Sequence, residues 1–280
     1  MIKKISFVFL LVILFATLIL LCSFPRVKSH ISERVLVSET FEKFPVGKLS
    51  FASLASDIGN TELACGKLDW LKFELGITPY PIFIKCDTGN KYLSVLLQLG
   101  NTMPVTGSQW DVLLDSSYRE LTLSYRVKFD SSFVFKPGKL PGIRGGVQVA
   151  GVRPNGKDGL AARLMYWKGG RLSLYLYHPE QPRGFGDILF TNGNDSSTFC
   201  FSVNRWYEVA LHVKLNDVGA RNGLVYATID GVEVLRKENL RFRDIPTLGL
   251  DKLSFSVFAN EIAPSKDEHI YFDDLVLNTN

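Results

Sequence analysis

The chain has little cysteine and histidine, and this scarcity excludes several kinds of site. Its 280 residues include four cysteines and four histidines, with neither a Cys-x-x-Cys pair nor a cluster of cysteine and histidine. Zinc sites in proteins usually draw their ligands from such clusters. We therefore expect no metal site.

The chain also lacks a net charge once its first residues are set aside. Of 32 basic residues in all, four lie in residues 1–29, which contain no acidic residue, so 28 basic and 28 acidic residues follow. A surface that binds nucleic acids broadly is usually basic. Because the remaining chain is formally neutral, and 46% of all residues are hydrophobic, we expect a folded protein with no nucleic-acid partner.

The N-terminus carries a long apolar run. Lys3 and Lys4 precede the almost entirely apolar residues 5–22. A basic segment before an apolar run is typical of a secretory signal, while a run of 18 residues can also cross a bilayer as an anchor. We expect residues 1–29 to be a signal peptide or a signal anchor. The domain in residues 30–280 would then be secreted or held outside the cytoplasm, with membrane contact only through an uncleaved segment.

Disulfides persist outside the cytoplasm, so the cysteines after residue 29 matter. These are Cys65, Cys86 and Cys200, an odd number that leaves at least one of them unpaired. Cys65 and Cys86 form the more local pair, but the sequence alone leaves the connectivity open.

Most of the remaining chain shows the alternation of apolar and polar residues that indicates β-strands. In residues 120–129 every second residue, from Leu121 to Phe129, is apolar. The same period recurs over residues 172–177, 207–215, 253–258 and 270–277. Residues 225–235 have the pattern of a hairpin around Asp230-Gly231.

These patterns predict an all-β fold. A sustained apolar stripe of helical period is absent from the chain after residue 29, so helices should be short and peripheral. Many strands separated by glycine, proline and asparagine are typical of a jelly-roll β-sandwich of two antiparallel sheets. We expect one such domain over residues 30–280, as a monomer, with residues 30 to about 50 as a mobile lead-in or an edge strand.

Two basic residues lie in unusual segments. Residues 136–146 hold two prolines and four glycines around Lys139, which predicts a loop that fixes this lysine at a sheet edge. Arg163 lies in the apolar strand predicted over residues 161–167, on the face that carries Ala161, Met165 and Trp167. An arginine in such a strand needs a partner. A bound carboxylate and a structural salt bridge across the sheet both stay open.

Two tyrosines lie two residues apart in the strand predicted over residues 172–177. Tyr175 and Tyr177 therefore share one face, and Leu172, Leu174 and Leu176 share the other. If the leucines point into the core, the two phenols line the open concave face of the sandwich.

A lysine, an arginine and two phenols suit β-elimination on a uronate polysaccharide. The C6 carboxylate must be neutralised, and the planar guanidinium of Arg163 can pair with it. A lysine or tyrosine of lowered pKa can remove the C5 proton, and a neutral tyrosine can protonate the departing O4. This chemistry needs no cofactor. The pattern leaves open which of Lys139, Tyr175 and Tyr177 is the base and which the acid.

Several motifs occur together around these residues. They are Lys139-Leu-Pro-Gly142 with Gly145-Gly146, Ala161-Ala-Arg-Leu-Met165, Leu174-Tyr-Leu-Tyr-His178, Trp-x8-Leu-Asn over residues 206–216, Asp230-Gly231 and Phe272-Asp-Asp274. In order and spacing this set resembles the alginate and glucuronan lyases of polysaccharide lyase family 14 over roughly residues 120–280. The resemblance implies a concanavalin-like jelly roll, an acidic polysaccharide as partner, and catalytic positions at Lys139, Arg163, Tyr175 and Tyr177.

Four further residues are predicted to contact the sugar. Gln148 can bind a hydroxyl or carboxylate group, Tyr166 and Trp167 can stack on sugar rings, and His178 can support the site from the end of its strand. Each has an ordinary alternative, because aromatic residues are common in cores, and a strand glutamine or a turn histidine is often only solvated.

One departure from the family pattern supports a second hypothesis. The family usually carries a serine two residues before the arginine, where this chain has Ala161. A non-catalytic, lectin-like sandwich that binds anionic glycans is therefore the alternative. A glycoside hydrolase, which needs two carboxylates, is least favoured because Asp158 is the one acidic residue in residues 136–178. The sequence leaves open which uronate polymer is cleaved.

Overall fold

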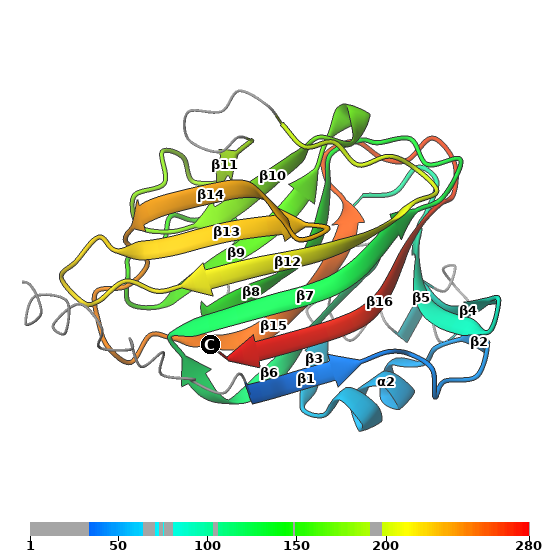
Figure 1. Ribbon diagram of the computed structural model, residues 1–280, viewed down its shortest axis with the longest axis horizontal. Coiled ribbons are helices and arrows are strands. Elements are labelled where there is room, and N and C mark those ends of the chain that lie inside the picture. Colours follow the sequence, from blue (N-terminus) through cyan, green and yellow to red (C-terminus); the bar gives the residue numbers. More distant parts are fainter. Residues whose placement is uncertain are drawn as a thin grey trace, which may run out of the picture. The chain divides into compact units, whose positions relative to one another are not determined.

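The strands of the protein form two antiparallel sheets that pack face to face. The computed structural model describes residues 34–63, 71–72, 75, 81–102, 106–147, 149–190 and 198–279. Figure 1 shows the nine-stranded sheet in front of the seven-stranded sheet. The predicted all-β jelly-roll sandwich is confirmed.

The nine-stranded sheet contains both the chain's first described strand and its last. Its order is β14 (Val232–Leu240), β13 (Gly223–Ile229), β12 (Trp206–Lys214), β7 (Glu120–Phe129), β16 (Glu268–Thr279), β5 (Asn90–Leu97), β4 (Ile82–Asp87) and β2 (Gly47–Lys48), with β1 (Arg34–Glu39) beside β16. Among the described strands β1 pairs with β16 alone, so the start of the domain is an edge strand, one of the two predicted alternatives.

The seven-stranded sheet carries the segments that the sequence singled out. Its order is β11 (Asp187–Leu189), β10 (Leu172–Tyr177), β9 (Gly159–Tyr166), β8 (Gly138–Gly146), β15 (Leu250–Ala259), β6 (Ser108–Tyr118) and β3 (Thr61–Leu63). β8, β9 and β10 are consecutive in the chain and adjacent in the sheet, whereas β15 and β6 come from distant parts of the sequence.

The core lies between the sheets, where the alternating patterns predicted it. Leu121 and Leu123 of β7 and Leu174 of β10 are fully buried in the same hydrophobic cluster. The predicted hairpin is present between β13 and β14, because Asp230 and Gly231 both have positive φ, 51° and 79°, as a tight two-residue hairpin turn requires.

The helices whose bounds the structure describes are short, as expected. α2 (Phe51–Ile58) begins after Ser50, whose hydroxyl accepts a hydrogen bond from the backbone N–H of Ser53, and buries Leu54. A single 3₁₀ turn, η1 (Lys168–Gly170), lies between β9 and β10. No helix within the described residues has the length and hydrophobicity that crossing a membrane requires.

The structure corrects the prediction of a loop over residues 136–146. Most of this segment is β8, which pairs with β9 on one side and β15 on the other, so it lies inside the sheet. The pairing register shifts between Lys139 and Gly142, around Pro141, which has no N–H to donate. A strand with such a bulge tolerates proline and glycine and re-aims the side chains beside it. Lys139 is therefore held by a central strand.

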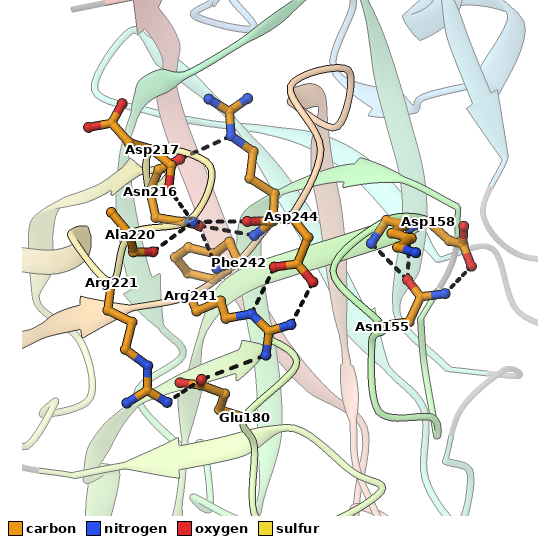
Figure 2. Close-up of polar contacts among 12 residues, drawn as sticks. Asn155, Asp158, Glu180, Asn216, Asp217, Ala220, Arg221, Arg241, Phe242 and Asp244 are labelled. Atoms are coloured by element: carbon orange, nitrogen blue, oxygen red, sulfur yellow. Dashed lines mark hydrogen bonds and ion pairs between the residues drawn. The ribbon is translucent and has the colours of Figure 1, made fainter.

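Buried Asn216 fastens together the segments that follow β12 and β14. Its side-chain oxygen accepts hydrogen bonds from the backbone N–H groups of Phe242 and Arg243, at 2.7 and 3.0 Å, and its amide donates to the carbonyl of Ala220 (Figure 2). Glu180 lies in the loop after β10 and pairs with Arg221 and Arg241, and Figure 2 shows both pairs. The Leu-Asn motif thus has a structural role.

Several predictions concern residues that lie outside the described part of the chain. These are the signal peptide or anchor in residues 1–29, Cys65 and Gln148. Contacts divide the chain into residues 1–32 and 33–280, and the fold above belongs to the second unit. Cys86 and Cys200 are free, exposed thiols.

Candidate functional site

Three neighbouring strands present the predicted catalytic residues on the outer face of the seven-stranded sheet. β8 carries Lys139, β9 carries Arg163, and β10 carries Tyr175 and Tyr177. In the strand register Tyr175 lies opposite Arg163, and Lys139 lies opposite Met165. Because the leucines of β10 fill the core, the phenols point away from it. The structure therefore brings these four residues onto one face.

The two tyrosines form a hydrogen-bonded pair. Their hydroxyl oxygens are 3.1 Å apart and their rings meet edge to face. The backbone N–H of Gly186 donates to the hydroxyl of Tyr175 at 3.2 Å, and that of Gly151 donates to Tyr177 at 3.1 Å. One hydroxyl donates to the other, so the second hydroxyl keeps its proton for an outside acceptor. Burial, followed by the hydrogen bond to Tyr177, raises the pKa of Tyr175 and keeps it neutral.

Gly186 is needed for this arrangement. A β-carbon at this position would lie 2.9 Å from Cζ of Tyr175 and 3.0 Å from the carbonyl oxygen of Leu176. Such distances are too short for carbon atoms in van der Waals contact. Glycine lets the loop after β10 approach the phenol closely enough to donate its N–H.

Lys139 lies against aromatic rings. Its Nζ is 4.9 Å from the ring centroid of Tyr175 and 5.0 Å from that of Phe258 on β15. Burial, and then the positive charge of Arg163, lower the pKa of Lys139 to about 7, against the opposing effect of Glu261. A substantial fraction of the amine is therefore neutral near pH 7 and able to accept a proton.

Arg163 is buried without an anionic partner. It is 7% exposed, its Nε has no hydrogen-bond partner, and it forms no ion pair with any described residue. Burial lowers its pKa. Gly142, opposite it on β8, makes room for the side chain, because a β-carbon there would lie 2.4 Å from Cβ of Arg163. The structural salt bridge that the sequence left open is absent at Arg163 and is made instead by Arg144 with the buried Asp111 of β6.

Trp167 lies at the edge of the same face. It is half-buried, packs against the cluster that contains Ala161, Met165 and the two tyrosines, and donates from Nε1 to the hydroxyl of Ser173 at 2.8 Å. Its ring also meets that of Phe190 edge to face. Its predicted contact with a sugar ring stays a prediction.

The predicted sugar contact of Tyr166 is wrong. Tyr166 is 1% exposed and packs between the sheets against Phe129, Phe133 and Phe135. The reason is strand alternation, since Tyr166 lies two residues after Leu164 in β9 and points with it into the core.

His178 also points away from the outer face. It is 4% exposed, its Nε2 lies 3.3 Å from a carboxylate oxygen of Asp187, and its ring lies edge to face with that of Phe242. It follows Tyr177 directly and so continues the inward row of leucines. His178 supports the strand end from beneath and does not line the face, which corrects its prediction as a substrate-binding residue.

The sequence reasoning did not predict that Phe258 packs against Lys139, and it missed the Arg144–Asp111 pair. Asp111 interrupts an otherwise apolar stretch between Trp110 and Val112, a pattern of the kind that singled out Arg163. Among the described residues, no group of three or more histidine, cysteine, aspartate or glutamate side chains has the arrangement to hold a metal ion.

Together the groups on this face can perform three tasks. The unpaired guanidinium can bind a carboxylate. The amine of lowered pKa can accept a proton, and the neutral phenol pair can donate one.

Comparisons with known proteins give a family and a fold. A family model described as polysaccharide lyase 14 matches residues 94–275, whereas no curated protein matches the chain. The fold is similar to that of the alginate lyase Aly36B, with a TM-score of 0.70 and 24% identity over 88% of this chain and 96% of that one.

Two further structures show the same fold. A mutant of Aly36B in complex with an alginate tetrasaccharide has a TM-score of 0.71 and 22% identity, over 89% of this chain and 97% of that one. The marine PL-14 alginate lyase from Aplysia kurodai has a TM-score of 0.62 and 22% identity, over 79% of this chain and 98% of that one.

Proposed function

Because the chain belongs to polysaccharide lyase family 14, we propose that it cleaves a uronate polysaccharide, alginate or glucuronan, by β-elimination without a metal ion. One observation carries this proposal above the others. The buried guanidinium of Arg163 has no anionic partner among the described residues, and it lies on the same sheet face as the amine of Lys139 and the phenol pair. A uronate carboxylate supplies the missing anion.

The proposed reaction assigns one task to each group. Arg163 binds the C6 carboxylate and makes the C5 proton more acidic. Neutral Lys139 takes that proton, the electron pair forms the C4–C5 double bond, and the bond from C4 to the departing O4 breaks. A phenol of the Tyr175–Tyr177 pair protonates O4, and the ammonium of Lys139 returns a proton to the phenolate. The lowered pKa of Lys139 and the raised pKa of Tyr175 support this division into base and acid.

Two observations support the proposed substrate class: what similar proteins bind, and the positive charge on the outer face of the seven-stranded sheet. The similar structures include an alginate lyase with a bound alginate tetrasaccharide. The cations Lys139 and Arg163 on the outer face suit a polymer with one carboxylate on each sugar. The choice between alginate and glucuronan is left to the experiment.

The test is to incubate the purified protein with polymannuronate, polyguluronate and glucuronan while following the ultraviolet absorbance of the C4–C5 double bond. We expect absorbance to grow with one of the three polymers, also in the presence of a chelator. Tyr177→Phe, which removes a single hydroxyl, should abolish it. A folded protein that produces no absorbance with any polymer contradicts the proposal.

One observation favours a second function. Ala161, which replaces the family's usual serine, lies opposite Tyr177 in the register, so the missing hydroxyl belongs beside the phenol pair. A protein without it that only binds anionic glycans would be retained on a uronate polymer column without turning it over. Tyr177→Phe would then leave retention unchanged.

We further propose that the domain acts outside the cytoplasm, because of the basic and apolar residues 1–29. Expression of the full chain in a secreting host distinguishes the two forms. N-terminal sequencing of protein from the medium identifies cleavage, and recovery from the membrane fraction identifies an anchor. Recovery from the cytoplasm alone contradicts the proposal.

A further inference from the structure

A row of residues crosses the seven-stranded sheet at the level of Arg163. In the register Asp111 of β6 lies opposite Ser254 of β15, Ser254 lies opposite Gly142 of β8, and Gly142 lies opposite Arg163 of β9. Two small residues therefore stand between the carboxylate at one end and the guanidinium at the other. The row continues to Tyr175 on β10.

Asp111 is the anionic end of this row. It is fully buried, one of its carboxylate oxygens pairs with Nη2 of Arg144, and the other has no hydrogen-bond partner. Arg144 is itself 8% exposed, and its second carboxylate contact, with Glu62 at 3.7 Å, is to a half-exposed side chain. A buried carboxylate with an unused oxygen is costly, so its retention needs a reason beyond stability.

The buried charges on this face do not balance. Lys139, Arg144 and Arg163 contribute three basic groups, whereas Asp111 is the one fully buried carboxylate among the described side chains of this face, because Glu62 and Glu261 are exposed. Lys252 is already paired with Asp251. The opposing influences on the Arg163 guanidinium are Asp111, which favours its charge, and Arg144, which disfavours it.

We propose that Asp111 is a positioning residue that holds the guanidinium of Arg144 and sets the net charge around Arg163, so that a single uronate carboxylate is bound and the anionic product is released. This inference rests on the proposed lyase function for its ligand. In the proposed reaction Asp111 touches neither the sugar nor the reacting atoms and acts through the two arginines. Without it, the array holds an additional unbalanced positive charge, binds anions more tightly and disfavours protonation of Lys139.

The groups that face Lys139 determine how its titration responds. They are Arg163 from β9, Tyr175 from β10 and Glu261 from the segment after β15, while Arg163 in turn faces Asp111, Arg144 and Tyr177. Removing the negative charge of Asp111 leaves this set more positive. The pKa of Lys139 should then fall further, by about one unit for charges interacting through partly buried protein.

The experiment uses a charge rescue in the full-length protein. In a plot of kcat/KM against pH, activity falls on the acidic side as Lys139 is protonated, and we call this part of the profile the acidic limb. Asp111→Asn should move the acidic limb about one pH unit lower. It should also tighten inhibition by the unsaturated trisaccharide product about tenfold and lower kcat. Adding Arg144→Gln to Asp111→Asn returns the net charge to its original value and should restore both the limb and the inhibition constant. Asp115→Asn is the matched control, since it removes an exposed carboxylate from the same strand and should leave both unchanged.

Three outcomes overturn the inference. They are a folded Asp111→Asn protein whose acidic limb does not move, a folded Asp111→Asn protein whose product inhibition is unchanged, and a double variant in which Arg144→Gln restores neither. If Asp111→Asn does not fold, the single variant Arg144→Gln tests the inference instead. It removes a positive charge, so it should move the acidic limb to higher pH and weaken product inhibition. NMR titration of ¹³C-labelled lysine, with Lys139→Met for assignment, measures the same pKa shift without turnover. A shift in a protein inactive on every polymer supports the charge role of Asp111 while contradicting the lyase function.

Discussion

The outer faces of the two sheets both place cations against aromatic rings, but with different surroundings. On the nine-stranded sheet, Nζ of Lys128 lies 4.9 Å from the ring centroid of Trp206 and near two tyrosine rings, and Arg126 pairs with Asp273 and Asp274. On the seven-stranded sheet, Nζ of Lys139 lies 4.9 Å from the ring of Tyr175. Arg163, beside Lys139 on that face, has no ion pair with a described residue.

This difference in burial and ion pairing distinguishes a cation that only packs against a ring from a cation that can take part in a reaction. A cation above a ring at a surface adds a modest attraction. Burial of the amine, and then the positive charge of the unpaired Arg163 guanidinium, lower the pKa of Lys139 to about 7, which makes the amine a usable base. The same residue types therefore have different tasks because of burial and of which carboxylates are nearby.

The largest expected effect is that of Lys139→Met. It removes the proposed base and should lower kcat by roughly 10³-fold or more. It should also raise the melting temperature at pH 7 by roughly 4 °C, because a desolvated amine is replaced by an apolar side chain that packs against Tyr175 and Phe258. Initial rates and thermal unfolding measure both effects, and a variant that retains turnover refutes Lys139 as the base.

Arg163→Lys should have the next largest effect. The charge is kept but the planar fork that matches a carboxylate is lost, so kcat/KM on the polymer should fall roughly 10²-fold while the fold is retained. Steady-state kinetics measure this loss. Equal kcat/KM for variant and native protein would show that Arg163 does not bind the substrate carboxylate.

The pH dependence tests the titration of Lys139. Its amine must be neutral to act as a base, so kcat/KM should rise about tenfold per pH unit below pH 7 and level off above it. Stability should change in the same direction. The folded protein binds fewer protons than the unfolded chain between about pH 7 and the ordinary lysine value of 10.5, and the contribution of Lys139 to stability therefore rises with pH over that window. Activity that falls as pH rises through 7 would instead indicate that the ammonium is the required form.

Ala161→Ser should have a smaller effect. It places a hydroxyl opposite Tyr177, at the position where the family usually has one, and should raise kcat on the preferred polymer by a few-fold. Initial rates measure this change. A lower kcat in Ala161→Ser would show that the site works better with alanine than with serine at this position.

The smallest effect is expected for Lys128→Met, the counterpart of Lys139→Met on the other sheet. Turnover should be unchanged, and stability should fall by about 1 kcal/mol or less, because a surface cation–π contact is lost. Denaturant unfolding and initial rates check this. A large loss of turnover would remove the distinction between the two faces.

Prediction from sequence succeeded where neighbours along the chain carry the information. The strand over residues 120–129, the hairpin at Asp230-Gly231 and the shared face of Tyr175 and Tyr177 all follow from a period of two residues. The same rule, applied consistently, would have placed Tyr166 in the core. Residues 136–146 were predicted as a loop because proline and glycine usually interrupt strands, whereas the bulge in β8 accommodates them.

By itself the sequence determined the all-β class, the strand faces and the residue types available for catalysis, because these depend on local alternation and on motif spacing. The tertiary structure alone decided that β8 lies inside the sheet, that Phe258 packs against Lys139, and that Asp111 pairs with Arg144. The reason is physical. Desolvation and charge pairing depend on which strands become neighbours, and β6, β8 and β15 meet from distant parts of the chain.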